Sequence, residues 1–142
     1  MKVNIKKLHN NAIIPKYSKD GDAGMDLTAT SRFEDEYGNM TYGTSLAFEI
    51  PKGYVGLLFP RSSNSKKDLY LTNHVGVIDS GYRGEVMLKY RLAIGKGNAK
   101  IYDVGDRIGQ LIIMPYPQIE FQEVEELSDT ERGDRGYGST GS

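Results

Sequence analysis

Five short clusters hold most of the residues in this chain that could act on a phosphate ester. In each, glycines or other small residues stand beside a carboxylate, an arginine or a hydroxyl. Backbone N–H groups exposed by glycine, together with hydroxyl and guanidinium groups, are the donors that a polyphosphate needs. The clusters are 22–27 (DAGMDL), 60–63 (PRSS), 76–85 (GVIDSGYRGE), 106–111 (DRIGQL) and 132–141 (RGDRGYGSTG).

Two aspartates in these clusters, Asp26 and Asp79, could hold a hard cation or activate a water molecule. With the phosphate-binding donors they indicate hydrolysis of a nucleotide phosphate. Each cluster alone also fits a simpler interpretation. Gly-Asp and Asp-Ser-Gly are ordinary turn sequences, and Arg61 or Arg107 could pair with a surface carboxylate. The combination of all five favours the functional interpretation.

The composition excludes several other classes of protein. A length of 142 residues suits one domain, and 18 Lys and Arg against 19 Asp and Glu give a formal charge of −1. That balance lacks the positive field of a protein that binds polymeric nucleic acid. The absence of cysteine excludes thiolate metal sites, and two histidines argue against a histidine-rich zinc site. No apolar stretch is long enough to span a membrane, so we expect no membrane association and a cytoplasmic location.

Short strands must position these clusters. The clearest is predicted at 85–94, where apolar and polar residues alternate and Val86, Leu88, Tyr90, Leu92 and Ile94 share one face. Turn residues rich in glycine, proline and aspartate separate it from the other predicted strands. These lie at 46–50, 54–59, 75–78, 100–104 and 107–114.

Helical signals are weak by comparison. One helical turn is predicted at 62–67, with Ser62 or Ser63 as its cap, and 118–127 fits neither the helical nor the strand period. The acidic segment 33–42 (FEDEYGNMTY) is interpreted as a solvated hairpin rather than a partner site. Many short strands at close spacing predict an all-β fold, either a sandwich, a jelly roll or a barrel.

The last stretch of the chain differs in kind from the rest. Residues 128–142 contain one aromatic residue, Tyr137, and no aliphatic residue, so they cannot bury enough apolar surface to order themselves. We therefore expect a β-rich core at 1–127, followed at 128–142 by either a disordered tail or an arm that becomes ordered on a ligand or a neighbouring chain.

The five clusters, in this order, resemble the five sequence motifs of the trimeric dUTP pyrophosphatases (dUTPases), and the resemblance covers nearly the whole chain. It implies a jelly-roll-like β fold with at most one short helix, assembled as a homotrimer whose active sites lie between subunits. It also implies Mg²⁺-dependent hydrolysis of dUTP to dUMP and pyrophosphate, by attack of water on the α-phosphorus. Such a reaction keeps uracil out of DNA and supplies dUMP.

The resemblance assigns the base, the sugar and the water to one part of the chain. Asp79 is expected to orient and activate the attacking water. Tyr82 is expected to pack against the deoxyribose and leave no space for a 2′-hydroxyl. Asn73 and the following backbone through Gly76, Val77 and Ile78 are expected to read the uracil edge.

Other residues are expected to bind the phosphates and the metal ion. By the same resemblance Arg61, Ser62, Ser63 and Gln110 line the phosphate side, with Arg61 setting the conformation of the site, and Asp26 holds Mg²⁺ through water. The C-terminal arm is expected to close over the bound nucleotide and exclude water. In it, Tyr137 would stack on uracil, and Arg132, Gly138, Ser139 and Thr140 would lie on the γ-phosphate side.

The arm departs from the family pattern, which commonly reads Arg-Gly-x-Gly-Gly-Phe-Gly-Ser-Thr-Gly. Here Arg135 replaces a glycine and restricts the backbone, and Tyr137 replaces the phenylalanine, although a tyrosine can still stack. Two alternatives stay open from the sequence. One is a dCTP deaminase-like enzyme of the same fold, and the other is a regulatory protein whose arm contacts a partner when nucleotide is bound.

Overall fold

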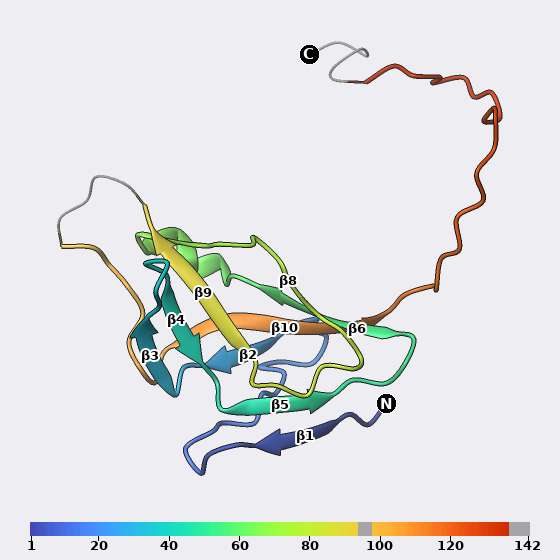
Figure 1. Cartoon of the computed structure of the whole chain (residues 1–142). Coiled ribbons are helices and arrows are strands. Elements are labelled where there is room, and N and C mark those ends of the chain that lie inside the picture. Colours follow the sequence, from blue (N-terminus) through green and yellow to red (C-terminus); the bar gives the residue numbers. More distant parts are fainter. Residues whose placement is uncertain (94–97, 137–142) are drawn as a thin grey trace.

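Short β-strands build almost the whole of the structure, a computed structural model that describes residues 1–93 and 98–136 (Figure 1). The strands are β1 (Asn4–Lys7), β2 (Met25–Thr28), β3 (Ser31–Glu34), β4 (Met40–Gly43), β5 (Leu46–Glu49), β6 (Tyr54–Phe59), β7 (Leu69–Leu71), β8 (Gly76–Ile78), β9 (Met87–Leu92) and β10 (Arg107–Pro115). The helical element of the described residues is one 3₁₀ turn, η1 (Ser62–Lys66).

The strands form two four-stranded antiparallel sheets and one two-stranded ribbon. Their orders are β2-β10-β6-β8, β3-β4-β9-β7 and β1-β5. The core lies where the sheets face each other, with Leu58 and Ile108 contributed by the first sheet and Leu88 and Tyr90 by the second. The predicted all-β, jelly-roll-like fold is confirmed. In the described ranges no helix is long and apolar enough to cross a membrane.

Most of the predicted strands are present. Residues 54–59 match β6 at both ends, and the other confirmed strands (β5, β8, β9 and β10) differ from the prediction by a few residues at most. Leu88 and Tyr90 on the inward face of β9 are buried as expected, and so is Val86 just before the strand, but Leu92 is exposed at the end of the strand. Ile94 lies outside the described residues. The 3₁₀ turn confirms the predicted helical turn at 62–67.

The strand predicted at 100–104 is wrong, because its backbone donors are used elsewhere. The Lys100 N–H donates to the Asp68 carboxylate at 2.8 Å, and the Asp103 N–H donates to the Asp106 carboxylate at 2.8 Å. A second bond, from the Asp106 N–H to the Asp103 carbonyl at 3.0 Å, closes the turn. Two of the five N–H groups of this segment therefore bond to carboxylates instead of to a neighbouring strand.

The acidic segment 33–42 forms a hairpin, as predicted, with β3 and β4 as its two strands. Its tip is held by Asp35, whose carboxylate accepts the Asn39 side-chain and backbone N–H groups and the Lys89 ammonium. The hairpin is only partly solvated, however. Tyr42 is fully buried, because β4 is an inner strand between β3 and β9.

Three tyrosines join the sheets at the centre of the core. The rings of Tyr42, Tyr90 and Tyr102 lie 5.5–5.9 Å apart between centroids, and each hydroxyl donates a hydrogen bond. Tyr102 donates to the Asn64 side chain at 2.8 Å, which ties η1 to the core. Burial raises the pKa of Tyr42 to about 12 and also raises the pKa of Tyr90 and of Tyr102.

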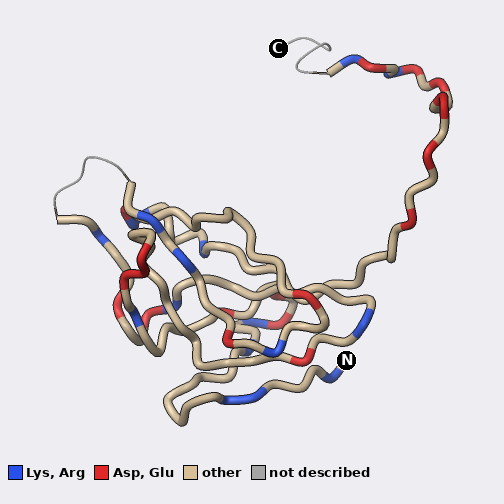
Figure 2. The backbone as a smooth tube through the Cα atoms, viewed as in Figure 1, with Lys and Arg blue, Asp and Glu red and all other residues tan. Residues whose placement is uncertain are grey.

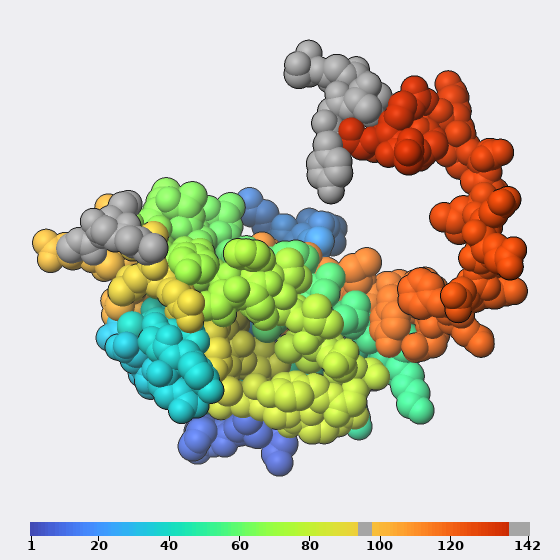
Figure 3. Space-filling view, turned by 45° about the horizontal axis from the view of Figure 1, so that its top comes forward, coloured from blue at the N-terminus to red at the C-terminus, as the bar shows by residue number. Residues whose placement is uncertain are grey.

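After β10 the chain leaves the body of the protein. Residues 116–136 form no strand, and Figure 3 shows them standing away from the sheets. Acidic residues are spread along this segment (Figure 2), between exposed apolar residues such as Phe121 and Leu127. The segment 118–127, which fitted neither period, therefore takes neither structure.

Candidate active site

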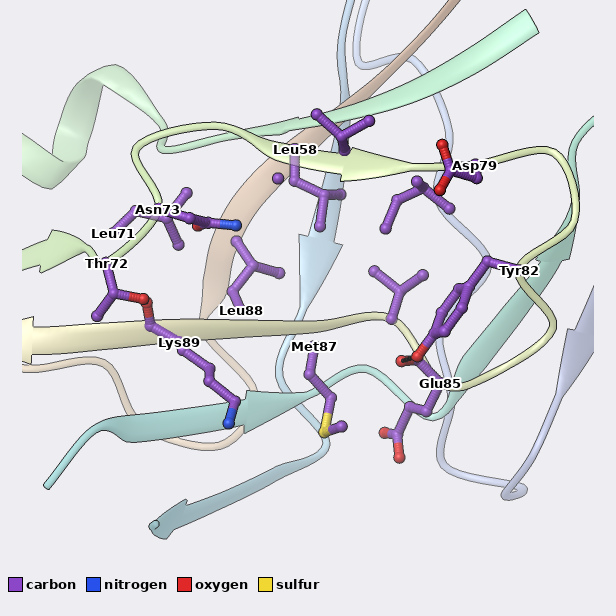
Figure 4. A pocket seen from close by; sticks show the side chains of 14 residues that line it. Leu58, Leu71, Thr72, Asn73, Asp79, Tyr82, Glu85, Met87, Leu88 and Lys89 are labelled. Carbon is purple, nitrogen blue, oxygen red and sulfur yellow. Dashed lines mark hydrogen bonds between the residues drawn. The ribbon is translucent and has the colours of Figure 1, made fainter. Parts of the chain in front are cut away.

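A pocket of about 360 Å³ gathers most of the residues expected to bind a nucleoside. It opens between the segment that carries β8 and the strand β9, and Figure 4 shows Asn73 at one end and Asp79 with Tyr82 at the other. Apolar side chains such as Leu71 and Leu88 line the pocket between them. Gly76, Val77 and Ile78 also line it, so the structure brings all six residues of the expected base, sugar and water site together.

The edge position of β8 explains how backbone could read a base here. β8 pairs with β6 on one side only, with Gly76 opposite Leu58 and Ile78 opposite Gly56, and it is the last strand of its sheet. An edge strand presents unpaired N–H and C=O groups on its outer side. The turn before it is tight, since His74 has a φ of 60° and the Val75 N–H donates to the Asn73 carbonyl at 2.6 Å.

The loop after β8 places Asp79 and Tyr82 at the rim. The Tyr82 N–H donates to the Asp79 carbonyl at 3.1 Å, which closes a turn between the two residues. The Tyr82 hydroxyl donates to the Glu85 carbonyl at 3.0 Å, and its ring lies over Gly84. A Cβ at position 84 would stand 2.6 Å from the ring carbon Cζ, so any larger residue there would displace the Tyr82 ring from this position. The Asp79 side chain is exposed, within reach of a ligand in the pocket.

The residues expected on the phosphate side form a second cluster around Asp26. Its two carboxylate oxygens accept Arg61 Nε at 2.8 Å and Arg107 Nη1 at 3.1 Å. Arg61 Nη1 donates to Ser63 Oγ at 3.1 Å, and Gln110 Nε2 donates to the Pro60 carbonyl at 3.1 Å. Two guanidinium groups against one carboxylate leave a net positive charge, which favours an anion.

The predicted capping of η1 by Ser62 or Ser63 is wrong. Arg61 occupies the cap position without a side-chain cap bond, and Ser63 Oγ instead accepts from the Arg61 guanidinium. Ser62 is exposed at the first position of the turn. Beside the cluster lies an open pocket of about 680 Å³, with Arg61, Ser63, Lys66, Lys67, Lys100 and Arg107 among its lining residues.

Asp26 fits a metal ion only through a bridging water molecule. Among the described residues no group of three or more histidines, aspartates or glutamates lies close enough to form a metal cage. Each Asp26 oxygen already accepts one arginine donor, and a carboxylate oxygen has about two lone pairs. One acceptor position per oxygen therefore remains for a water molecule bound to an ion. This fits Mg²⁺, which keeps several of its waters and takes most other ligands from phosphates.

The two clusters lie far apart on the same sheet. Asp26 and Phe59 are both in register with Gln110, whereas Ile78 is opposite Gly56 on β6. Asp79 is therefore displaced from the Asp26 row by about 13 Å along the strands and, because β10 and β6 intervene, by about 14 Å across them. One phosphate group cannot contact both carboxylates of a single chain.

The described part of the tail also lies away from both clusters. Arg132 Nε donates to the Arg135 carbonyl and Arg135 Nε to the Arg132 carbonyl, both at 3.0 Å. Figure 1 shows this segment far from the sheets, so the structure does not bring Arg132 to the pocket. Tyr137 and the run 138–140, which the sequence analysis assigned to the arm, lie outside the described residues.

Two residues of these clusters have contacts whose partners the sequence did not identify. Arg107 belongs to the fourth cluster, with a surface ion pair as its simpler interpretation, and it does pair with a carboxylate, that of Asp26, which it shares with Arg61. Glu85 was included in the third cluster without a role, yet its carboxylate accepts the Ser45 N–H at 2.7 Å and it lines the base pocket. The one sequence signal for these contacts was the position of Arg107 in the same cluster as Gln110. The contact of Glu85 with Ser45 joins distant segments of the chain, so it leaves no local sequence pattern.

Comparisons with known proteins agree on one family. The family model described as dUTPase matches residues 10–141. A deoxyuridine 5′-triphosphate nucleotidohydrolase of Crocosphaera subtropica is 41% identical over 143 residues, with 99% of each chain covered.

Two solved structures are also similar. A dUTPase variant of Staphylococcus bacteriophage 80alpha with dUpNHpp has a TM-score of 0.80 at 29% identity, covering 99% of each chain. A dUTPase variant of phage phi11 of S. aureus has a TM-score of 0.72 at 28% identity, covering 89% of this chain and 98% of that one. The latter structure concerns the coordination of a structural Mg(II) ion.

Proposed function

The chain belongs to the dUTPase family and is a dUTP-hydrolysing enzyme, and from that premise we propose how its residues divide the reaction. The single observation that carries the proposal is the pocket of about 360 Å³ that gathers Asn73, the edge of β8, Asp79 and Tyr82. In one place the pocket offers hydrogen-bonding groups that could recognise the base, an aromatic surface for the sugar and a carboxylate that could activate water.

Uracil is read by the outer edge of β8 and by Asn73. The base presents an acceptor, a donor and an acceptor in a row, and a strand edge offers alternating N–H and C=O groups. Cytosine carries an amino group in place of one acceptor, so two donors would face each other. A buried mismatch of this kind discriminates strongly between otherwise similar substrates.

Tyr82 and Asp79 act on the rest of the nucleoside. The Tyr82 ring packs against the deoxyribose and occupies the space of a 2′-hydroxyl. Asp79 accepts a proton from a water molecule whose oxygen attacks the α-phosphorus, and the bond from that phosphorus to the bridging oxygen breaks. Pyrophosphate leaves and dUMP remains. An ordinary carboxylate is a modest base, so much of the rate comes from positioning and charge stabilisation.

Arg61, Ser62, Ser63 and Gln110 hold the phosphates, and Asp26 holds Mg²⁺ through water. When bound, the ion neutralises charge on the triphosphate. The pair of guanidinium groups on Asp26 supports this assignment, since it fixes the carboxylate and leaves the cluster positive. The relative from phage phi11 with a structural Mg(II) ion is consistent with a magnesium-dependent enzyme.

A complete site needs more than one copy of the chain. The separation between the Asp79 and Asp26 clusters supports sites shared between subunits, with the base half from one copy and the phosphate half from another. We propose the homotrimer of the family for this assembly. Residues 1–127 then form the core, and 128–142 form an arm that closes over the nucleotide and brings Arg132 and the run 137–140 to it. A cytoplasmic location belongs to the same proposal, because dUTP is part of the pool that supplies DNA synthesis.

The test is pyrophosphate release from dUTP, dCTP, dTTP and UTP at equal concentrations, each with Mg²⁺ and with a chelator. Release confined to dUTP and abolished by the chelator is expected. Release of ammonia from dCTP would instead favour the deaminase-like alternative. Hydrolysis of UTP at the rate of dUTP would contradict the role of Tyr82 in excluding the 2′-hydroxyl. Hydrolysis of dUTP with the chelator present would contradict the dependence on Mg²⁺.

A further inference from the structure

Glu85 connects the loop of the base pocket to a distant turn. Its Oε1 accepts the backbone N–H of Ser45 at 2.7 Å, in the turn between β4 and β5. Ser45 has a φ of 55°, a left-handed conformation that a serine adopts only when its surroundings hold it there. A Cβ at Gly43 would stand 2.6 Å from the same Oε1, so the carboxylate lies directly against the backbone of this turn.

The main chain beside Glu85 is fixed to the same turn. The Val86 N–H donates to the Leu46 carbonyl at 2.9 Å, and Thr44 Oγ1 donates to the Val86 carbonyl at 2.7 Å. Val86 and Thr44 are both buried, so these bonds are shielded from water. The side-chain contact of Glu85 completes a set of three hydrogen bonds that hold residues 85 and 86 against the turn at 44–46.

The Tyr82 ring depends on that fixed position. Its hydroxyl donates to the Glu85 carbonyl at 3.0 Å, and its ring covers Gly84. The Tyr82 side chain is otherwise open to solvent, with 43% of the residue exposed, and an exposed side chain samples several rotamers unless something holds it. Its far end is held by the hydrogen bond to the Glu85 carbonyl, whose position the bond between the Glu85 carboxylate and Ser45 helps to set. Figure 4 shows the Tyr82 and Glu85 side chains next to each other at one end of the pocket.

We propose that Glu85 is a positioning residue that fixes the Tyr82 ring and thereby sets the discrimination between deoxyribonucleotide and ribonucleotide. This inference rests on the proposed contact of Tyr82 with the sugar. Glu85 itself does not touch the reacting atoms. Its carboxylate faces the Ser45 N–H, and only its carbonyl faces the ring.

The experiment measures kcat/KM for dUTP divided by kcat/KM for UTP, in the full-length assembled enzyme. Glu85→Ala should lower this ratio by at least about tenfold, because a freed ring no longer excludes the 2′-hydroxyl. Glu85→Gln should keep the ratio, since an amide oxygen still accepts from Ser45. Glu85→Asp keeps the charge but withdraws the oxygen by one methylene, so it should behave like alanine and serves if the alanine variant does not fold.

The matched control is Glu49→Ala. Glu49 is another carboxylate near the same loop, at the end of β5 and 3.6 Å from Arg83. Its side chain is half-exposed, and its ion pair is with Arg83 rather than with Tyr82. Its removal should leave the ratio unchanged. A lower melting temperature in Glu85→Ala and Glu85→Asp with an unchanged ratio would show that Glu85 is only structural, and would overturn the inference.

Two variants of Tyr82 distinguish a failure of the Glu85 inference from a failure of the proposed contact between Tyr82 and the sugar. Tyr82→Ala should lower the ratio, and an unchanged ratio would remove the tyrosine from sugar selection and the inference with it. If Tyr82→Ala lowers the ratio but Glu85→Ala does not, the role of Glu85 alone fails. In a Tyr82→Phe background, which lacks the hydroxyl tether, Glu85→Ala should have no further effect on the ratio.

Discussion

At the scale of single residues, the role proposed for the Asp79 side chain is chemical rather than structural. Its side chain is exposed at the rim of the pocket, and its contact with Tyr82 is through its backbone carbonyl. A carboxamide in its place keeps the size but cannot accept a proton from water. Such a position is well placed for a substitution that stops chemistry and spares the fold.

We therefore expect Asp79→Asn to lower turnover by roughly 10²–10⁴, the range for a positioned base, while nucleotide binding survives. Pyrophosphate release gives the first quantity, and calorimetric titration with a non-hydrolysable dUTP analogue gives the second. Asp20→Asn, at an exposed position outside the base pocket, is the control and should keep full turnover. Near-normal turnover in Asp79→Asn would exclude the aspartate as the base.

At the scale of elements, the buried tyrosines between the two large sheets are expected to make the core sensitive to alkali. Burial raises the pKa of Tyr42 to about 12, with smaller opposing effects from its bond to the Tyr102 carbonyl and from Arg32. An unfolded tyrosine titrates near pH 10. The folded state therefore keeps a proton that the unfolded state loses, and the stabilisation present below pH 10 declines between pH 10 and about 12.

The expected result is a melting temperature that falls steeply above pH 10, with a shallower fall in Tyr42→Phe. At pH 7 the same variant should lose about 1 kcal/mol, because one buried hydrogen bond disappears. The Tyr102 carbonyl keeps its bond from Arg32 Nη1 at 3.0 Å. Thermal unfolding from pH 7 to pH 12 measures both effects, with Tyr37→Phe, at an exposed tyrosine, as the control. An alkaline slope identical to that of the wild type would contradict the role of Tyr42.

The elements also show how far the sequence predicts this fold. Apolar and polar residues alternate in 85–90, and successive side chains of a strand point to opposite faces of the sheet. The pattern predicts this strand correctly because β9 has one buried face. The segment 100–104 forms no strand, since the carboxylates of Asp68 and Asp106 accept its Lys100 and Asp103 N–H groups. Competition from side chains far along the chain is invisible in a local pattern.

At the scale of the whole molecule, we expect the tail to be separable from the core. It follows β10, and the described residues 128–136 are exposed and bond only among themselves. Removing 128–142 should therefore leave the melting temperature within a few degrees of the full chain while turnover falls sharply, because the site is no longer closed. Thermal unfolding and pyrophosphate release on the same preparation test this. A truncated chain that does not fold would make the tail architectural.

The proposed assembly yields a prediction about mixtures. In the proposed shared site, Asp79→Asn damages the half that binds the base and Asp26→Asn the half that binds the phosphates, so each variant alone should be nearly inactive. Co-refolded in equal amounts, random assembly should place both intact halves together in about a quarter of the sites, which restores about a quarter of the activity. A mixture no more active than its components would show that each chain builds its site alone.

The sequence by itself determined which chemistry is available and where along the chain it lies. The types and spacing of residues in 76–85 and 106–111 mark a phosphate-ester site, and alternation marks most of the strands, because both signals are local. Only the tertiary structure decided that Asn73 and Asp79 share a pocket, that Asp26 lies three strands away from Asp79, and that Glu85 reaches Ser45. Strand order and register set those contacts, and they join segments whose separation along the chain carries no local signal.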